Sequence, residues 1–158
     1  MCGIAGWIDY SRSLKQEGPI MDRMMAELAK GGPDERGKWF AEDAVFGDRR
    51  LAVVDIEGGK QPMTIESDRG TFTICYNGEL YNTEELRKDL LVKGYSFKGH
   101  SDTEVLLTSY IEWRERAVDL ANGIYAFAVW HHEKEELFLA RDRLGVKPLF
   151  YKEIGRGL

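Results

Sequence analysis

The sequence predicts a domain in which layers of β-strands pack against layers of α-helices. The candidate strands gather near the beginning and the end of the chain, and the candidate helices lie mostly between them. This grouping favours α+β or α/β layers over a regular alternation of one strand and one helix. The 158 residues and the hydrophobic fraction of 43% are those of one globular domain with its own core.

The first part of the chain predicts three strands and one helix. Residues 2–9 read as a strand, and two more strands are expected at 38–46 and 50–55. A helix is predicted over 20–30, because methionine and leucine side chains recur there at steps of three and four residues. These side chains are Met21, Met24, Met25 and Leu28. The glycines and the proline of segment 31–33 end the helix.

The second part of the chain supplies further strands and two helices. The strands are predicted at 71–76, 124–130, 137–141 and 148–152, and the helices at 84–93 and 103–113. Residues with a capping side-chain oxygen stand before each helix: Asn82 or Thr83 before the first, and Ser101 or Asp102 before the second. Both helices are therefore expected to begin at a capped N-terminus.

The composition argues against several classes of partner. The net charge of −5 and the lack of a long basic cluster argue against nucleic acid. No apolar run is long enough to span a bilayer and no signal segment opens the chain, so we expect a cytoplasmic protein without a membrane partner. Cys2 and Cys75 lie far apart and imply neither a disulfide framework nor a zinc site. We expect no metal ion and no other cofactor.

Cys2 is the first candidate for chemistry. If Met1 is removed after synthesis, Cys2 carries both a thiol and a free α-amine, and the amine can take the proton of the thiol. The reference pKa of an α-amino group, roughly 7.7–8.0, suits this role near neutral pH. Retention of Met1 would block the mechanism. The structural alternative is a small apolar residue that opens a strand, and residues 1–9 alone favour that alternative.

Asn77 and Gly78 form the second candidate, at the end of a predicted strand. The side-chain amide of Asn77 and the unobstructed N–H of Gly78 could point two donors at one oxygen, as an oxyanion hole requires. The alternative is a hairpin turn, which is the commonest meaning of an Asn-Gly dipeptide. The dipeptide by itself favours the turn.

Arg50 and Asp102 could hold a substrate by its charges. An arginine at the start of a buried-looking strand can clamp a carboxylate with its planar fork, although a surface salt bridge is the alternative. Asp102 at the start of a helix can bind an ammonium group, and its alternative role is the helix cap. If the two side chains converge on one pocket, they would hold an α-amino acid by both charged ends.

Other charged or reactive residues are given structural roles. Segment 141–148 is predicted to be an Arg–Asp network that holds a turn between two strands. The neighbouring His131, His132 and Glu133 predict a solvated turn, because adjacent histidines in a hairpin cannot readily face one metal ion. Cys75, in the middle of a strand, is predicted to be a small core residue.

Seven motifs in one order resemble the class II glutamine amidotransferases, with the greatest similarity to the glutaminase domain of asparagine synthetase. The resemblance covers nearly the whole chain, and the ordered set is highly specific although each motif alone is weak. The motifs are Met-Cys-Gly-Ile-Ala-Gly at the start, Gly32-Pro33-Asp34, Arg50-Leu51 with Asp55, Gln61-Pro62-Met63, residues 77–82, residues 101–104 and residues 141–149.

The resemblance implies an α+β fold, the four-layer αββα sandwich of the N-terminal-nucleophile hydrolases. It also implies an activity, the hydrolysis of the side-chain amide of glutamine to glutamate and ammonia. It assigns roles to eight residues: Cys2 as nucleophile with its own α-amine as base, Asn77 and Gly78 as oxyanion hole, Arg50 for the substrate carboxylate, Glu79 and Asp102 for its ammonium, and Val53 and Val54 as pocket lining. It implies an ammonia-accepting synthetase domain or subunit as partner, and asparagine biosynthesis as the setting.

Three positions depart from the pattern of the family. Lys30-Gly31 stands where His-Arg is usual, Asp48 where His is common, and Ala52 where Ser is usual. The first change affects the loop after the helix. The other two lie near the carboxylate clamp and are expected to alter the affinity for glutamine.

The residues leave several expectations for the chain as a whole. We expect residues 1–158 to form one glutaminase domain that lacks the synthetase domain and is truncated at its C-terminal end. An open sheet edge there predicts a homodimer. One alternative is a non-catalytic glutamine-binding or assembly module that retains the fold, and another is a hydrolase of the same fold that acts on a different amide. The pairing of Arg50 with Asp102 favours a substrate with both α-groups over the latter.

Overall fold

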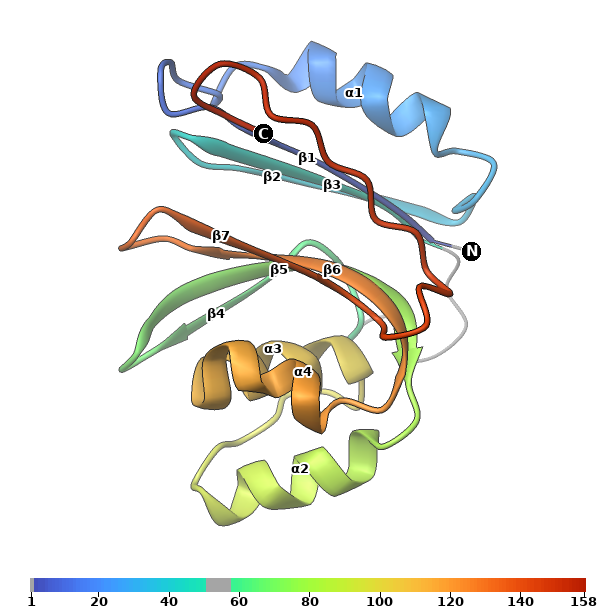
Figure 1. The fold of residues 1–158 in the computed structure, drawn as a ribbon, viewed down its shortest axis with the longest axis vertical. Coiled ribbons are helices and arrows are strands. Elements are labelled where there is room, and N and C mark those ends of the chain that lie inside the picture. The colour runs from blue at the N-terminus through green and yellow to red at the C-terminus, as the bar shows by residue number, and fades with distance from the viewer. Residues whose placement is uncertain (1, 51–57) are drawn as a thin grey trace.

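The computed structural model describes residues 2–50 and 58–158. Two antiparallel sheets face each other, and helices cover the outer face of each sheet (Figure 1). The first sheet has the order β1-β3-β2, and helix α1 lies on its outer face. The second sheet has the order β4-β5-β6-β7, and helices α2, α3 and α4 lie on its outer face. The result is a four-layer αββα sandwich of the α+β class.

The elements follow in chain order. Those of the first half are β1 Gly3–Ile8, α1 Gly18–Glu27, β2 Glu35–Phe40 and β3 Ala44–Arg50. Those of the second half are β4 Met63–Ser67, β5 Gly70–Leu80, α2 Thr83–Val92, α3 Asp102–Trp113, a 3₁₀ turn Arg114–Arg116, α4 Ala117–Leu120, β6 Gly123–His131 and β7 Glu136–Arg141. None of these helices is long and apolar enough to cross a membrane.

Most of the predicted elements are present, but three differ from the prediction. The single strand predicted at 38–46 is wrong, because Ala41 N donates to Ala44 O at 2.7 Å and closes a tight turn between β2 and β3. Strand β4 was not predicted. The strand predicted at 148–152 is also wrong, because this segment crosses from one sheet to the other and its backbone follows neither (Figure 1). Beyond Arg50, the strand predicted at 50–55 lies outside the described residues.

Alternation along β3 places its side chains on two different faces of the first sheet. Val45 packs with Met21 and Met25 of α1, on the outer face. Phe46 packs with Cys75 of the second sheet, on the inner face. By the same alternation Asp48 and Arg50 share the inner face with Phe46. The polar end of β3 is therefore directed at the space between the sheets.

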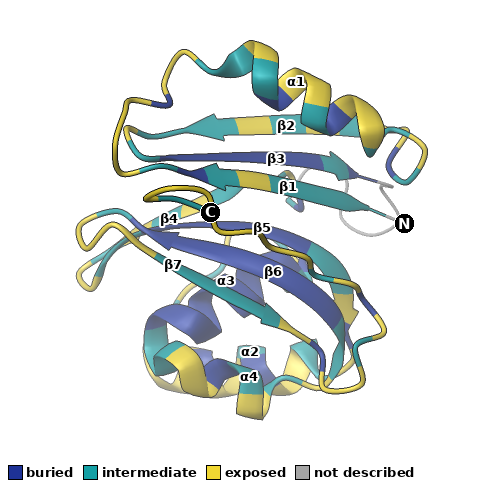
Figure 2. Cartoon of the chain, turned by 45° about the horizontal axis from the view of Figure 1, so that its top comes forward, coloured by how far each residue is buried: buried dark blue, intermediate teal, exposed yellow. Residues whose placement is uncertain are grey.

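The second sheet and its helices form the largest core. Helix α3 is buried along most of its length, and side chains of β5, β6 and α2 pack against it. Figure 2 shows the central strands and α3 as the buried parts of the molecule, whereas the C-terminal segment is mostly exposed. This core fixes β5 and the start of α3 against each other, which matters for the site described below.

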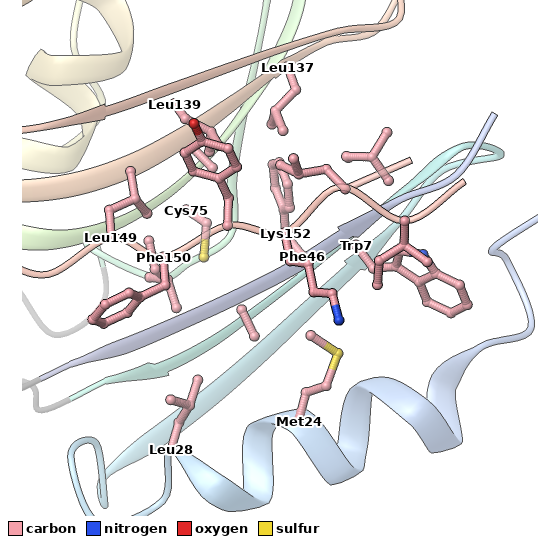
Figure 3. Close-up of a pocket in the computed structure, with 18 of the residues that line it drawn as sticks. Trp7, Met24, Leu28, Phe46, Cys75, Leu137, Leu139, Leu149, Phe150 and Lys152 are labelled. Carbon is pink, nitrogen blue, oxygen red and sulfur yellow. The ribbon is translucent and has the colours of Figure 1, made fainter. Parts of the chain in front are cut away.

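An apolar cavity of about 650 Å³ separates the two sheets beside β1 and β7. Side chains of both sheets and of the C-terminal segment line it, among them Trp7, Phe46, Cys75, Leu139, Leu149 and Phe150 (Figure 3). At its far end Leu158 and Ile8 exchange two backbone hydrogen bonds of 2.9 Å. The last residues of the chain thus close part of the gap along β1.

Candidate active site

Most of the residues predicted for the site meet at one end of the sandwich, around a cavity of about 450 Å³. The predicted residues that line it are Cys2, Arg50, Asn77, Gly78, Glu79 and Asp102. They come from the start of β1, the end of β3, the end of β5 and the start of α3. Val53 and Val54, together with the departure at Ala52, lie outside the described residues.

Strand pairing brings Cys2 beside Arg50. The antiparallel register of β1 and β3 pairs Gly3 with Arg49, so the next pair along would be Cys2 and Arg50. Cys2 is half-buried, and its charge contributes to raising the pKa of Tyr76 on β5, after burial and the acids Asp102 and Glu79. The thiol therefore lies between the first sheet and the end of β5.

Asn77 and Gly78 continue strand β5 and do not form a turn. Asn77 pairs with Ala126 and Gly78 with Tyr125, and the strand runs on to Leu80. A type I′ turn would need positive φ at both residues, and neither has it. A Cβ atom at Gly78 would lie 2.4 Å from the carbonyl oxygen of Ile124, so close approach to β6 explains this glycine. The hairpin interpretation is wrong.

The backbone N–H of Gly78 points into the cavity. Tyr76 N donates to Gln61 Oε1 at 2.5 Å, and Leu80 N donates to Asp102 Oδ2 at 3.2 Å. Both donors leave β5 on the side away from β6. Because N–H groups two residues apart leave a strand on the same side, the N–H of Gly78 between them points the same way. An oxygen atom in the cavity would find this donor.

Asp102 is a cavity residue and not the cap of α3. The cap is Ser101, whose hydroxyl accepts from Glu104 N at 3.3 Å. Asp102 Oδ2 accepts from Tyr76 OH at 2.8 Å, in addition to Leu80 N. Burial and this carboxylate raise the pKa of Tyr76 well above its usual value, so Tyr76 remains a donor at any physiological pH. The prediction that Ser101 or Asp102 caps the helix is confirmed for Ser101.

Arg50 is buried and lines the cavity, so its interpretation as a surface salt bridge is wrong. Its side chain is 8% exposed, and Nη1 donates to Glu35 Oε2 of β2 at 3.0 Å. Strands β2 and β3 place the two residues opposite each other in the sheet. The ion pair orients the guanidinium at the end of β3.

Gln61 and Lys147 line the same cavity, and no role was predicted for either residue. Gln61 joins the site to α3 as well as to β5, because its Nε2 donates to Thr103 Oγ1 at 3.4 Å. Its presence in the Gln61-Pro62-Met63 motif was the available signal. Lys147 is buried and follows the turn after β7, within the charged segment predicted to be structural.

The turn that carries Lys147 is held by backbone donors and not by an Arg–Asp network. The carboxylate of Asp142 accepts from the N–H groups of Tyr125, Val146 and Lys147, at 3.3, 2.9 and 2.9 Å. Burial opposes its ionisation, but the backbone donors outweigh burial, so the pKa of Asp142 lies below its usual range. The prediction of a structural turn is correct, but the predicted partners are wrong.

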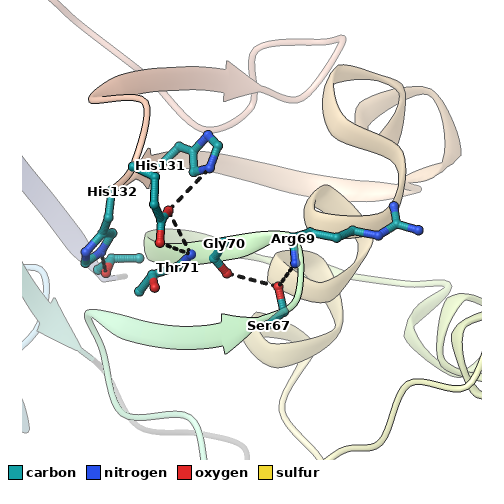
Figure 4. Close-up of polar contacts among 8 residues, drawn as sticks. Ser67, Arg69, Gly70, Thr71, His131 and His132 are labelled. Carbon is teal, nitrogen blue, oxygen red and sulfur yellow. Dashed lines mark hydrogen bonds and ion pairs between the residues drawn. The ribbon is translucent and has the colours of Figure 1, made fainter.

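The two neighbouring histidines lie beside the turn between β4 and β5 (Figure 4). His131 pairs with Phe72, whereas the cavity residue Gly78 pairs with Tyr125 at the other end of the β5–β6 ladder. His131 belongs to β6, is 5% exposed and stacks on Phe72 at 4.4 Å between ring centroids. His132 contacts Trp39 on the other face, and its Nε2 lies 2.8 Å from Thr73 Oγ1. The prediction of a solvated turn is therefore wrong for His131, but the two rings do face different partners.

The fold and the cavity define the class of this protein, and the comparisons agree. The whole chain, residues 1–158, matches the glutamine amidotransferase domain family, and the chain belongs to this family. It is similar in structure to the glutamine phosphoribosylpyrophosphate amidotransferase of B. subtilis, with a TM-score of 0.62 and 24% identity over 75% of this chain and 27% of that chain. The predicted four-layer αββα sandwich of the α+β class is confirmed.

The more particular likeness is to asparagine synthetases. The chain is 58% identical over 155 residues to asparagine synthetase [glutamine-hydrolyzing] 3 of Bacillus subtilis, which covers 98% of this chain and 25% of that protein. It is 40% identical over 157 residues to asparagine synthetase [glutamine-hydrolyzing] 1 of the same organism, covering 98% of this chain and 24% of that protein. The chain spans about a quarter of the length of these curated relatives.

Proposed function

We propose that this chain hydrolyses the side-chain amide of glutamine to glutamate and ammonia, with Cys2 as the nucleophile. The observation that carries the proposal is the direction of the Gly78 N–H, which enters the cavity that Cys2 lines, between two donors already anchored by Gln61 and Asp102. The family match favours this enzyme over a non-catalytic module that only binds glutamine.

The reaction would proceed in two steps through a thioester. After removal of Met1, the α-amine of Cys2 takes the thiol proton, and the thiolate attacks the amide carbon. Asn77 and the Gly78 N–H stabilise the negative oxygen of the tetrahedral intermediate. The proton passes to the leaving nitrogen, ammonia departs, and a water molecule then cleaves the thioester to release glutamate.

The substrate would be held by the charges at its α-carbon. Arg50 lies beside Cys2 at the end of β3 and would bind the α-carboxylate. Asp102 and Glu79 line the same cavity and would bind the α-ammonium, with Asp102 oriented by Tyr76 and the Leu80 N–H. A clamp of this kind selects a free amino acid over other amides.

Residues 1–158 would act as one glutaminase domain that supplies ammonia to a synthetase domain or a separate synthetase subunit. The support is the likeness to proteins named asparagine synthetase [glutamine-hydrolyzing], of which this chain spans about a quarter. The ammonia would then serve amide synthesis in asparagine formation.

The predicted homodimer is kept as a proposal. Large apolar side chains of the C-terminal segment remain exposed where they line the apolar cavity, among them Phe150, Tyr151 and Ile154. Apolar groups gathered in this way favour association with another surface. Light scattering over a concentration series would show a mass that rises toward the dimer, and a constant monomeric mass would contradict the proposal.

The catalytic proposal is tested by glutamate release from glutamine, with the intact mass of the same sample measured to confirm loss of Met1. Cys2→Ala is expected to abolish release, because no other thiol lines the cavity among the described residues. Cys75→Ala is the matched control, since this buried thiol lies between the sheets, and it should retain activity. Equal activity in Cys2→Ala and the parent would contradict the proposal.

A further inference from the structure

Asp48 is a buried carboxylate that the mechanism above does not use. It is 1% exposed, and within the described part of the chain its Oδ1 has no hydrogen-bond partner. A buried carboxylate oxygen without a donor is costly when the group is charged. Such a group is expected at a place where its charge serves a purpose beyond stability.

The pairing of strands β1 and β3 places Asp48 close to two residues of the proposed site, Cys2 and Arg50. Asp48 lies two residues before Arg50 on the same face of β3, and it pairs with Ile4 of β1. It is therefore a diagonal neighbour of Cys2 across the two strands, at roughly 7–8 Å between Cα atoms. From the second sheet, Cys75 approaches the same space, with its Sγ donating to Gly47 O at 3.3 Å.

Among the described residues, one cation and one other carboxylate act on Asp48: Arg50 of its own strand and Glu35 of β2. Two thiols approach the same space, Cys75 from β5 and Cys2 from the residue before β1. Glu35 already holds Nη1 of Arg50 at 3.0 Å. When Asp48 is also ionised, the positive charge of Arg50 is more than compensated before any substrate carboxylate arrives.

We propose that Asp48 is a positioning residue that controls the carboxylate clamp: the charge of its ionised form competes with the substrate α-carboxylate for the field of Arg50, and protonation of Asp48 removes this competition. The proposal rests on the function proposed above, because it takes Arg50 as the clamp. It makes the affinity for glutamine depend on the protonation state of a residue that never contacts the substrate.

The titration of Asp48 falls in the range where this control matters. Burial raises the pKa of the carboxyl, Arg50 opposes the rise and Glu35 adds to it, with a result of about 7. Below that pH the carboxyl is neutral and does not compete with the substrate carboxylate. Above it the carboxylate competes, so glutamine affinity should fall as the pH rises through neutrality.

Calorimetric binding of glutamine to the Cys2→Ala variant from pH 6 to pH 8.5 tests this control without turnover. In the Cys2→Ala background Kd should rise by roughly tenfold per pH unit above the pKa of Asp48, as expected for loss of one proton. Adding Asp48→Asn should give a Kd that is nearly constant and, at pH 8, close to the value that Asp48 allows at pH 6. Among active proteins, the same substitution should flatten the pH profile of KM and leave that of kcat in place.

Three further variants separate this control from other titrations and from misfolding. Asp22→Asn, an exposed aspartate on α1, and His100→Gln, a histidine that lines the cavity, should both keep the pH dependence of Kd. Glu35→Gln removes the carboxylate that raises the pKa of Asp48, so it should move the midpoint to lower pH. That shift tests the proposal even if Asp48→Asn does not fold.

The outcomes distinguish this inference from the proposed function. A Kd that does not change with pH while Asp48 is present, or a pH dependence that survives Asp48→Asn, would overturn the role of Asp48 alone. No binding at any pH, together with no glutamate release by the parent protein, would overturn both.

Discussion

Two buried aspartates in this protein behave in opposite ways. Asp142 is 4% exposed and Asp48 is 1% exposed, so burial opposes the charge of both. Asp142 accepts three backbone hydrogen bonds, and its pKa is lowered. Asp48 Oδ1 receives no hydrogen bond from residues 2–50 or 58–158, and the pKa of Asp48 is raised to about 7. Burial raises the pKa of both carboxyls, and the number of donors to each carboxylate decides whether that effect is outweighed.

This difference in hydrogen-bond donors gives the two aspartates different roles: Asp142 is structural, and Asp48 can regulate the site. Asp142 fixes the turn that carries Lys147 to the edge of the proposed site, and it stays ionised at any physiological pH. Asp48 lies beside Arg50 and can change its charge near neutrality. Stability should therefore depend on pH in opposite directions through the two residues.

The largest expected effect is the loss of the Asp142 carboxylate. Asp142→Ala would take the acceptor from the buried N–H groups of Tyr125 and Lys147 and from the partly buried N–H of Val146. We expect a loss of about 3–5 kcal/mol in the free energy of unfolding at pH 7. Urea unfolding monitored by tryptophan fluorescence would measure it. The contribution is present above the ordinary aspartate pKa and is lost as pH falls through the lowered folded-state value. A loss below about 1 kcal/mol would show that the Asp142 carboxylate does not stabilise the turn, and the contrast with Asp48 would then fail.

The next expected effect is that loss of the Asp48 carboxylate stabilises the fold, whereas loss of the Asp142 carboxylate destabilises it. The folded state binds a proton on Asp48 up to about pH 7 and the unfolded chain only up to about pH 3.8, so stability falls as pH rises between those values. One pKa unit corresponds to about 1.4 kcal/mol, so the difference between 3.8 and about 7 means that Asp48→Asn should stabilise the fold at pH 8 by on the order of 4 kcal/mol relative to its effect at pH 4. Unfolding curves at both pH values measure this difference. Equal effects at pH 4 and pH 8 would show that Asp48 has an ordinary pKa.

A smaller effect is expected from the hydroxyl that orients Asp102. Tyr76→Phe removes the donor 2.8 Å from Asp102 Oδ2 and should cost about 1–2 kcal/mol in the free energy of unfolding. The KM for glutamine should rise several-fold, because Asp102 Oδ2 then keeps only one of its two donors in the described chain, the Leu80 N–H. Tyr95→Phe, which removes a more exposed hydroxyl from Glu112 Oε2 at 3.0 Å, is the control and should leave KM unchanged. Equal KM values in both variants would remove the role of Tyr76.

The sequence predicted the elements with a strong local pattern and the residues with a strong family motif. The methionine repeat predicted α1, and alternation with β-branched and aromatic residues predicted β5. The motifs placed Cys2, Asn77, Arg50 and Asp102 in one site before the cavity was known. The helix and strand predictions succeeded because their signal lies within a few residues. The grouping of the four site residues came instead from the order of the motifs along the chain, and all four line one cavity.

The failures share the opposite property, because tertiary contacts decided them. Asn77-Gly78 has the local signature of a turn, yet pairing with β6 extends the strand through it. Asp102 has the signature of a cap, yet Tyr76 and Leu80 draw its carboxylate toward β5. The burial of Asp48 depends on the second sheet covering the first, and no local pattern indicates it.

The most direct test of the account is to trap the acyl-enzyme. Protein incubated with glutamine would be quenched rapidly in acid, digested, and analysed by peptide mass spectrometry. The account predicts a glutamyl adduct on the peptide that begins with Cys2 and lacks Met1, and no adduct on the peptide that contains Cys75. Steady glutamate release with the adduct on Cys75, or from a protein that retains Met1 throughout, would contradict the account.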